Sequence, residues 1–505
     1  MRDRLLAVLS ACALIASACG VRAFSPTATP SRPAEPVLAS STPAPTTAVD
    51  ARPELRPSTP PAAILVDDDG SGMALRARPI DPVTLADVPG YAPISFEHHY
   101  QAAVRKSDGL IAAILWPGGS TNYGGTVHLI DTRRWTDRVL DLKVDAYTSP
   151  LRFDASGASV YWAQPVWFAD TGTTTALWRL DVAAGSAREI VRLPPNLYAR
   201  DVRVLDGRVA IYAEPGPGNV TIGGQGRDPG PSVFVIDPAS ARMLSVALPV
   251  RAGQYQDASP ANADEPWRQI APGLAWDPSH RRLFVADAES ERIFHIDLDT
   301  GSINGPFEPK PRRSLVDALW ALVGGSTAQA KMVSADRQQA ELSADGRYLY
   351  VSGVRSTFAK GSDGKYHEQI VPLDLRVIDT FDMVELARTD AAATPLWLAP
   401  DAATLLYGTS IYDTRAEGYA TRSDFAVHVV DPLSLRDRKT LSVEGSPWLT
   451  SFDAGRHLAY VSWTSIVGGT LSRATVLTID LATDTIVSRR DLDRHYAEVL
   501  LIPAR

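Results

Sequence analysis

Two repeated features predict that most of this 505-residue chain is all-β and forms a β-propeller of four-stranded blades. The first is a strand that ends in Asp and leads through a turn into another strand, about every 50 residues. The second is a strand–turn–strand segment, found ahead of seven of these strands. Blades of about 40–50 residues produce such an interval, which unrelated strands would not keep.

The first feature is a hydrophobic strand whose last residue is Asp. An Asp side chain can accept hydrogen bonds from backbone amides one or two residues ahead and so fix the turn. Successive copies lie 50, 50, 56, 60, 82, 52 and 49 residues apart, which predicts one long insertion in an otherwise regular series. The eight copies end at Asp81, Asp131, Asp181, Asp237, Asp297, Asp379, Asp431 and Asp480.

The second feature supplies the first two strands of a blade. Its turns carry Asp-Gly or Asp-x-Gly, which are strong hairpin signals between β-rich runs. In the clearest copy, AELSADGRYLYVSG at 340–353 and LRVIDTFDMVELAR at 375–388 make a complete four-strand unit. Each blade is therefore expected to be an inner hairpin, a variable loop and an outer hairpin. The seven inner hairpins lie at 103–115, 151–163, 202–213, 273–286, 340–352, 396–408 and 449–462.

The two ends of the repeat region, 62–505, predict an eighth, composite blade. Only AILV at 63–66 precedes the first Asp, and YAEVLLIP at 496–503 has no strand after it. Pairing the last strand with the first ones would close the ring and remove its open edges. Pro79 argues against this pairing, because proline suits an interior strand poorly. Seven blades with the N-terminal strands packed outside are the alternative.

The long interval contains an expected helical insertion at 306–334. Within it, SLVDALWALVGG at 314–325 has apolar residues at a helical spacing. We expect a short helix packed against the side of the propeller. A helix that touches a membrane or docks a partner is the alternative.

Residues 1–18 are expected to be a lipoprotein-type signal peptide. Two arginines precede the apolar run LLAVLSACALIASA, which is short for a membrane span. ASAC at 16–19 resembles a bacterial lipobox, although Leu is commoner than Ala at its first position. The resemblance implies a lipid on Cys19 and a place in the cell envelope, on the extracytoplasmic side of the membrane. An ordinary cleaved signal, hence secretion, and an uncleaved anchor are the alternatives.

Residues 19–61 are expected to be a disordered tether that starts at the lipidated cysteine. Pro, Ala, Ser and Thr dominate this stretch, so it cannot build a core. Cys12 and Cys19 are the only cysteines of the chain. The repeat region therefore has no disulfide, no Cys-bound zinc and no iron–sulfur cluster. LSAC at 9–12 fits the lipobox better locally, but too few apolar residues precede it.

Composition excludes further classes of function. The net charge of -8, without a patch dense in Lys or Arg, argues against nucleic-acid binding. The catalytic patterns H-E-x-x-H and G-x-S-x-G are absent, and no glycine-rich phosphate loop opens a helix. DDDGSG at 67–72 lacks the alternation of a calcium loop and is expected to be a solvated turn. We therefore expect no catalytic set, no metal and no cofactor.

Four segments resemble one class of propeller. They are SADGRYLYVSG at 343–353, LRVID at 375–379, LFVAD at 283–287 and VHVVD at 427–431. These resemble blades of the YVTN/quinoprotein-amine-dehydrogenase-like class. The resemblance implies the architecture of most of the chain but no particular activity, because this fold carries unrelated functions.

The expected binding surface is one face of the ring. The longest loops, at 116–125, 214–231, 353–369 and 409–424, all join the second and third strands of a blade. These connections open on the same face as those between blades, and variable loops on a rigid scaffold are typical of binding sites.

The residues expected at that face are aromatic, basic or histidine, the kinds that dominate contact energies. Trp397 and Trp448, each preceded by Pro, are expected to pack between blades instead. A metal at the two adjacent histidines is disfavoured, because neighbouring side chains on a strand point to opposite faces. The candidate ligand-binding residues are His98, His99, Tyr100, Tyr198, Arg200, Trp267 and Arg268.

These observations predict a surface-tethered extracytoplasmic binding module. Its partners would be the membrane, through the lipid on Cys19, and an unknown protein, small molecule or glycan. The alternative is a propeller enzyme or enzyme subunit, lactonase-like or quinoprotein-dehydrogenase-like, with a site at the mouth of the ring. Carboxylates or histidines that meet there would favour the enzyme.

Overall fold

The structure is a computed structural model. It describes residues 62–68, 74–97, 100–115, 123–145, 149–168, 172–215, 230–255, 268–311, 334–360, 366–391, 395–399, 403–413, 421–467 and 470–502. The signal peptide, the tether with Cys19, and most of the expected insertion (312–333) lie outside these ranges. No described helix is long and apolar enough to cross a membrane.

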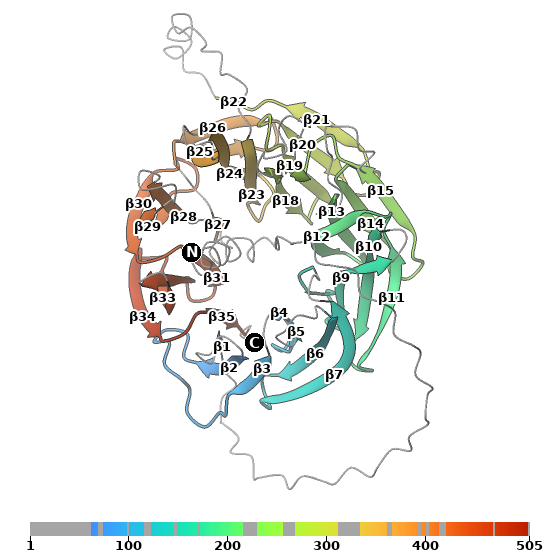
Figure 1. Ribbon diagram of the computed structural model, residues 1–505, viewed down its shortest axis with the longest axis vertical. Coiled ribbons are helices and arrows are strands. Elements are labelled where there is room, and N and C mark those ends of the chain that lie inside the picture. The colour runs from blue at the N-terminus through green and yellow to red at the C-terminus, as the bar shows by residue number, and fades with distance from the viewer. Residues whose placement is uncertain are drawn as a thin grey trace, which may run out of the picture. The chain divides into compact units, whose positions relative to one another are not determined.

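The described strands form eight blades around an axis, which confirms the eight-bladed propeller (Figure 1). We call the strands of a blade a to d, counting outward from the axis. Seven blades follow one another along the chain, and the eighth joins its two ends.

Blades 1 to 4 occupy the first half of the ring. Blade 1 holds β4 (Tyr100–Val104), β5 (Ile111–Leu115), β6 (Tyr123–Asp131) and β7 (Thr136–Asp145). Blade 2 holds β8 (Arg152–Phe153), β9 (Ser159–Phe168), β10 (Gly172–Asp181) and β11 (Ser186–Arg192). Blade 3 holds β12 (Leu197–Leu205), β13 (Arg208–Pro215), β14 (Ser232–Ile236) and β15 (Met243–Ala247). Blade 4 holds β18 (Gly273–Asp277), β19 (Arg282–Ala286), β20 (Ile293–Asp297) and β21 (Ile303–Phe307). A separate two-stranded sheet, β16 (Gly253–Tyr255) and β17 (Arg268–Ile270), precedes blade 4.

Blades 5 to 7 complete the consecutive series. Blade 5 holds β23 (Ser334–Leu342), β24 (Tyr348–Lys360), β25 (Tyr366–Asp379) and β26 (Val384–Thr389), with β22 (Lys310–Pro311) parallel to its outer strand. Blade 6 holds β27 (Leu396–Leu398), β28 (Leu405–Asp413), β29 (Thr421–Val430) and β30 (Asp437–Val443). Blade 7 holds β31 (Trp448–Asp453), β32 (Leu458–Val467), β33 (Thr470–Asp480) and β34 (Thr485–Leu492). The described ends of the expected helical insertion are therefore strands.

The closing blade unites the two ends of the repeat region. Its inner strand is β35 (Ala497–Leu501), followed outward by β1 (Ala63–Asp68), β2 (Ala74–Ile80) and β3 (Ile94–Glu97). β1 and β35 pair antiparallel over five residues of each strand. The backbone NH of Ile502 donates to the carbonyl of Ala62 at 3.0 Å. The composite blade is thus confirmed over the seven-blade alternative.

Pro79 is accommodated in this blade because its missing NH would point away from β1, toward a side where β3 no longer pairs with β2. Its carbonyl accepts a hydrogen bond from the NH of Val88 at 2.9 Å, so this side of Pro79 faces outward. β3 pairs only with residues 74–77 of β2. The missing NH of Pro79 therefore interrupts no pairing in the sheet, as at a sheet edge.

The expected solvated turn at Asp67 and Asp68 is wrong. Both residues end β1, where their exposed fractions are 0% and 2%. An Asp68 carboxylate oxygen accepts hydrogen bonds from the backbone NH groups of His495 and Tyr496, the latter at 2.6 Å. The residues that join blade 7 to β35 are therefore held by the N-terminal strand.

The core consists of apolar clusters between neighbouring blades. Leu65 and Val499 of the closing blade, for example, pack with Tyr460 and Val476 of blade 7. Trp397 packs into the cluster between blades 6 and 7. The ring of Trp448 stacks on that of Tyr496, with 6.3 Å between centroids. Both tryptophans therefore pack between blades, as expected.

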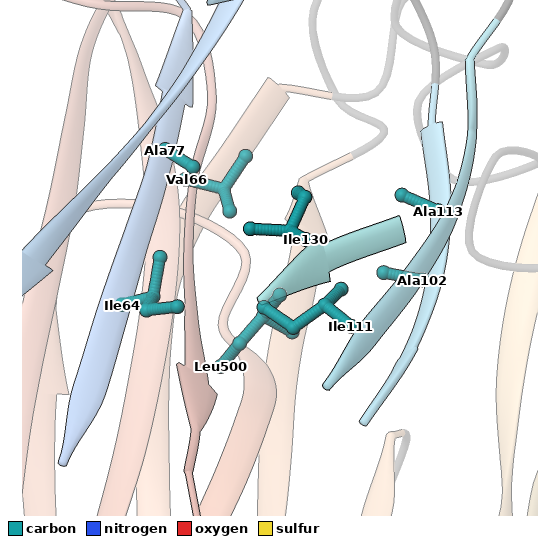
Figure 2. A pocket seen from close by; sticks show the side chains of 8 residues that line it. All are labelled: Ile64, Val66, Ala77, Ala102, Ile111, Ala113, Ile130 and Leu500. Atoms are coloured by element: carbon teal, nitrogen blue, oxygen red, sulfur yellow. The ribbon is translucent and has the colours of Figure 1, made fainter. Parts of the chain in front are cut away.

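A small cavity lies between the closing blade and blade 1 (Figure 2). Its volume is about 10 Å³, and every side chain that lines it is apolar. Such a space is a packing gap between two blades and offers no polar group to a ligand. Its lining residues are Ile64, Val66, Ala77, Ala102, Ile111, Ala113, Ile130 and Leu500.

The long loop expected at 353–369 is mostly strand. β24 and β25 pair as far as Lys360 and Tyr366, and β28 and β29 pair as far as Asp413 and Thr421. The connections between strands b and c are therefore extended β-hairpins in blades 5 and 6. We call the side of the ring on which these connections lie the hairpin face, and the opposite side, with the a–b and c–d turns, the turn face.

The strand-ending Asp residues fix the c–d turns as expected. Each accepts a hydrogen bond from the backbone NH two residues ahead, except Asp181, whose donor lies three residues ahead. The fourth residue after each Asp has φ between 53° and 75°, the left-handed region that favours glycine. These residues are Leu85, Trp135, Gly185, Ala241, Gly301, Met383, Leu435 and Asp484.

Ala241→Gly is expected to stabilise the protein by about 0.5 kcal/mol. Relief of the left-handed strain, about 1 kcal/mol, exceeds the entropy that glycine adds to the unfolded chain. Ala239→Gly is the matched control in the same exposed turn, where φ is not positive, and it should destabilise by a similar amount. Urea denaturation midpoints measure both. A midpoint that falls for both variants would show that the left-handed position carries no strain.

Candidate functional site

The structure describes only some of the seven residues that were expected at the hairpin face. His98, His99 and Trp267 lie outside the described residues. Tyr100 begins β4 and Arg268 begins β17, and only their backbone is described. Tyr198 and Arg200 lie close together on β12.

Arg200 forms an ion pair with a buried carboxylate. Its Nε lies 2.5 Å from Oε1 of Glu214, whose side chain is only 4% exposed. Tyr198 stands opposite Glu214 in the pairing of β12 and β13. The Tyr212 hydroxyl also donates to Glu214, at 3.4 Å. Arg200 therefore serves the packing of blade 3, since a buried carboxylate needs a partner.

A β-bulge at Arg200 changes the direction of the residues that follow. Ala199 pairs with Ala213 and Asp201 with Tyr212, which leaves Arg200 as the extra residue. Bulges re-aim side chains in this way. Beyond the bulge, Val202 and Val204 pack in the core, and the alternate residues Asp201 and Arg203 take the other side of the strand.

Four side chains from three consecutive blades meet at the inner wall of the ring, and a fifth, Glu341, stands on the innermost strand of the next blade. We call them the axial cluster. All stand on innermost strands, of which β12, β18 and β23 are labelled beside the axis in Figure 1. The members are Arg152 (β8), Asp201 and Arg203 (β12), Trp276 (β18) and Glu341 (β23).

Asp201 is the centre of the axial cluster. Its Oδ2 accepts hydrogen bonds from Nε of Arg203 at 2.9 Å and from the indole Nε1 of Trp276 at 2.8 Å. Its Oδ1 lies 3.6 Å from Nη2 of Arg152. Three neighbours from three blades therefore share one carboxylate.

The two arginines retain unused donors. Nη1 of Arg152 donates to the carbonyl of Leu151, but its Nε is shielded from water and has no partner among the described residues. Burial, followed by repulsion from Arg203, lowers the pKa of Arg152 to about 10. The side chain of Arg203 is 43% exposed and bonds Asp201 through Nε. Its two terminal nitrogens are thus directed to solvent.

Glu341 lacks the hydrogen-bond and ion-pair partners that Asp201 has. Its side chain is exposed to water at the axis, and no described residue bonds it. Although the side chain reaches water, the surrounding blades partly desolvate it. This desolvation raises the pKa of Glu341 to about 7, and the attraction of Arg203 opposes the rise. Because the folded chain holds this proton more tightly than the unfolded chain, Glu341 lowers stability as pH rises from about 4.5 to 7.

The axial cluster lies nearer the turn face than the hairpin face. Arg152, Arg203 and Glu341 each stand two positions before the a–b turn of their blades, opposite Tyr161, Ala210 and Tyr350. The sequence carries a signal for this: LRFDASG, VRVLDG and AELSADG have a charged residue where blades 1 and 4 have alanine. The prediction concentrated on loops and missed the inner strands.

The axial cluster offers two guanidinium groups, an indole and a carboxyl that can gain or lose a proton near neutral pH. These groups can hold an oxyanion and can transfer a proton. Among the described residues, no group of three or more His, Cys, Asp or Glu side chains could hold a metal ion.

Comparisons with known proteins support the fold. No family model and no curated protein matches the sequence. Among solved structures, the dihydro-heme d1 dehydrogenase NirN in complex with DHE is similar over 89% of this chain and 77% of its own, at 11% identity and a TM-score of 0.51. A candidate 6-phosphogluconolactonase from Bacteroides uniformis is similar over 76% of this chain and 96% of its own, at 13% identity and a TM-score of 0.38. At such identities the likeness shows the fold alone: the chain is a β-propeller repeat protein.

Proposed function

We propose that the protein is a surface-tethered extracytoplasmic binding module, of the YVTN/quinoprotein-amine-dehydrogenase-like class, that takes a small ligand at the axis of its propeller. The observation that carries the proposal is the axial cluster, where two neighbouring blades bring partly exposed guanidinium groups together at one carboxylate. Convergent polar groups on a rigid scaffold are typical of ligand sites.

Ala62, where the chain enters β1, adjoins the C-terminal end of β35 on the turn face. The lipobox-like ASAC at 16–19 and the Pro-rich residues up to 61 support the anchor itself.

Cell fractionation of Cys19→Ala tests the tether. We expect the wild-type chain to sediment with membranes and to be cleaved by protease added outside the membrane, and the variant to be released. Cys12→Ala is the matched control and should fractionate like the wild type. Membrane association that survives Cys19→Ala, or is lost in Cys12→Ala, would contradict lipidation at Cys19.

An acid–base enzyme is the second candidate. The observation in its favour is the pair of carboxyl groups, Asp201 with three neighbours and Glu341 with a raised pKa. Carboxyl groups held in such different environments are typical of sites that move protons. Turnover of a substrate that Glu341→Gln abolishes would favour this candidate over a binding module.

A further inference from the structure

We propose that the axial cluster binds the carboxylate group of a small ligand, which Arg152 and Arg203 hold. This inference deepens the proposed binding function and rests on it. It names the chemical class of the ligand and the residues that recognise it.

The first support for this proposal is that the two arginines have hydrogen-bond donors without partners among the described residues. A shielded donor without a partner, such as Nε of Arg152, costs free energy until something accepts its hydrogen bond. Both guanidinium groups already approach the same carboxylate, that of Asp201. A second carboxylate on the solvent-facing terminal nitrogens of Arg203, beside Arg152, would repeat this geometry, for which the arginine fork is suited.

The charge of the cluster selects a monoanion. Two arginines and Asp201 leave one positive charge, which a single carboxylate neutralises. A phosphate dianion would exceed this charge and would face Asp201. Phosphate and carboxylate share the same donors, so the charge distinguishes them.

Glu341 makes the binding dependent on pH. An ionised Glu341 would repel the ligand, whereas a protonated one would not, so ligand binding near neutral pH takes up protons from solvent. The charged groups that act on Glu341 are Arg203 and Asp201. Other titratable residues on strands packed against β23 are Arg268 on β17, Asp277 on β18, Arg282 on β19, and Tyr348, Tyr350, Arg355 and Lys360 on β24.

Calorimetric titration of the full chain, purified in detergent, tests the proposal with acetate, benzoate and inorganic phosphate as probes. We expect at least one carboxylate to bind more tightly than phosphate, and its affinity to fall at least tenfold from pH 6 to pH 8.5. Arg203→Met should weaken this binding at least tenfold. Glu341→Gln should retain binding and lose the dependence on pH.

Arg192→Met is the matched control, because Arg192 lies on the outer strand of blade 2 with Glu189. It should bind as the wild type does. The proposal is overturned by phosphate that binds as tightly as the carboxylates, by an absence of carboxylate binding, by Arg203→Met that binds like the wild type, or by a pH dependence that persists in Glu341→Gln. None of these outcomes changes the fractionation of Cys19→Ala, so the two proposals can fail separately.

Discussion

Deletion of residues 494–505 is expected to abolish the cooperative unfolding of the propeller. The deletion removes β35, in which Ala497 and Val499 are fully buried, and exposes Leu65 and its neighbours in β1. Loss of several apolar contacts of about 1.5–3 kcal/mol each approaches the whole stability of a typical domain. Circular dichroism melting and size-exclusion chromatography measure the effect.

Deletion of residues 503–505 alone is the control for this truncation. It leaves the hydrogen bond between Ile502 and Ala62 in place, and should not change the melting midpoint measurably. A cooperative transition in the longer deletion, at the wild-type temperature, would mean that the ring is stable without its composite blade.

Asp67→Asn is expected to destabilise the protein by about 3 kcal/mol, because removing the buried carboxylate leaves three partly buried cations uncompensated. The Asp67 carboxylate is fully buried, with Arg78 at 2.7 Å, Arg76 at 3.6 Å and Arg494 at 3.7 Å. Arg494 leads into β35, so the same carboxylate also holds the closing segment. Denaturant titration measures the loss.

Asp87→Asn is the matched control for this cluster. Asp87 pairs with Arg78 at 3.2 Å and Arg490 at 2.8 Å, but 48% of its side chain is exposed. Exposed pairs contribute about 1 kcal/mol or less. Equal losses for the two variants would show that burial of Asp67 does not set the strength of its ion pairs.

The repeat could be predicted from sequence because its signals are local. An Asp at the end of a strand and an Asp-Gly turn each act within a few residues, and their intervals count the blades. The composite blade followed from the unpaired ends of the chain. Pro79 argued against the composite blade in the sequence, because no local pattern predicts where β3 stops pairing with β2.

The candidate site could not be predicted in the same way, because it depends on contacts between blades. Arg152 and Trp276 are 49 and 75 residues from Asp201, and only the closed ring brings all three together. The direction of Asp201 also depends on the bulge at Arg200. Likewise, the buried position of Asp67 depends on Arg494, at the other end of the chain.

A crystal structure of the full chain grown with benzoate measures the position of a bound ligand directly. We expect the carboxylate to lie within hydrogen-bonding distance of the Arg203 guanidinium, on the inner wall of the ring. A ligand bound only among the hairpins of the opposite face, with none at the axial cluster, would contradict a binding site at the axis.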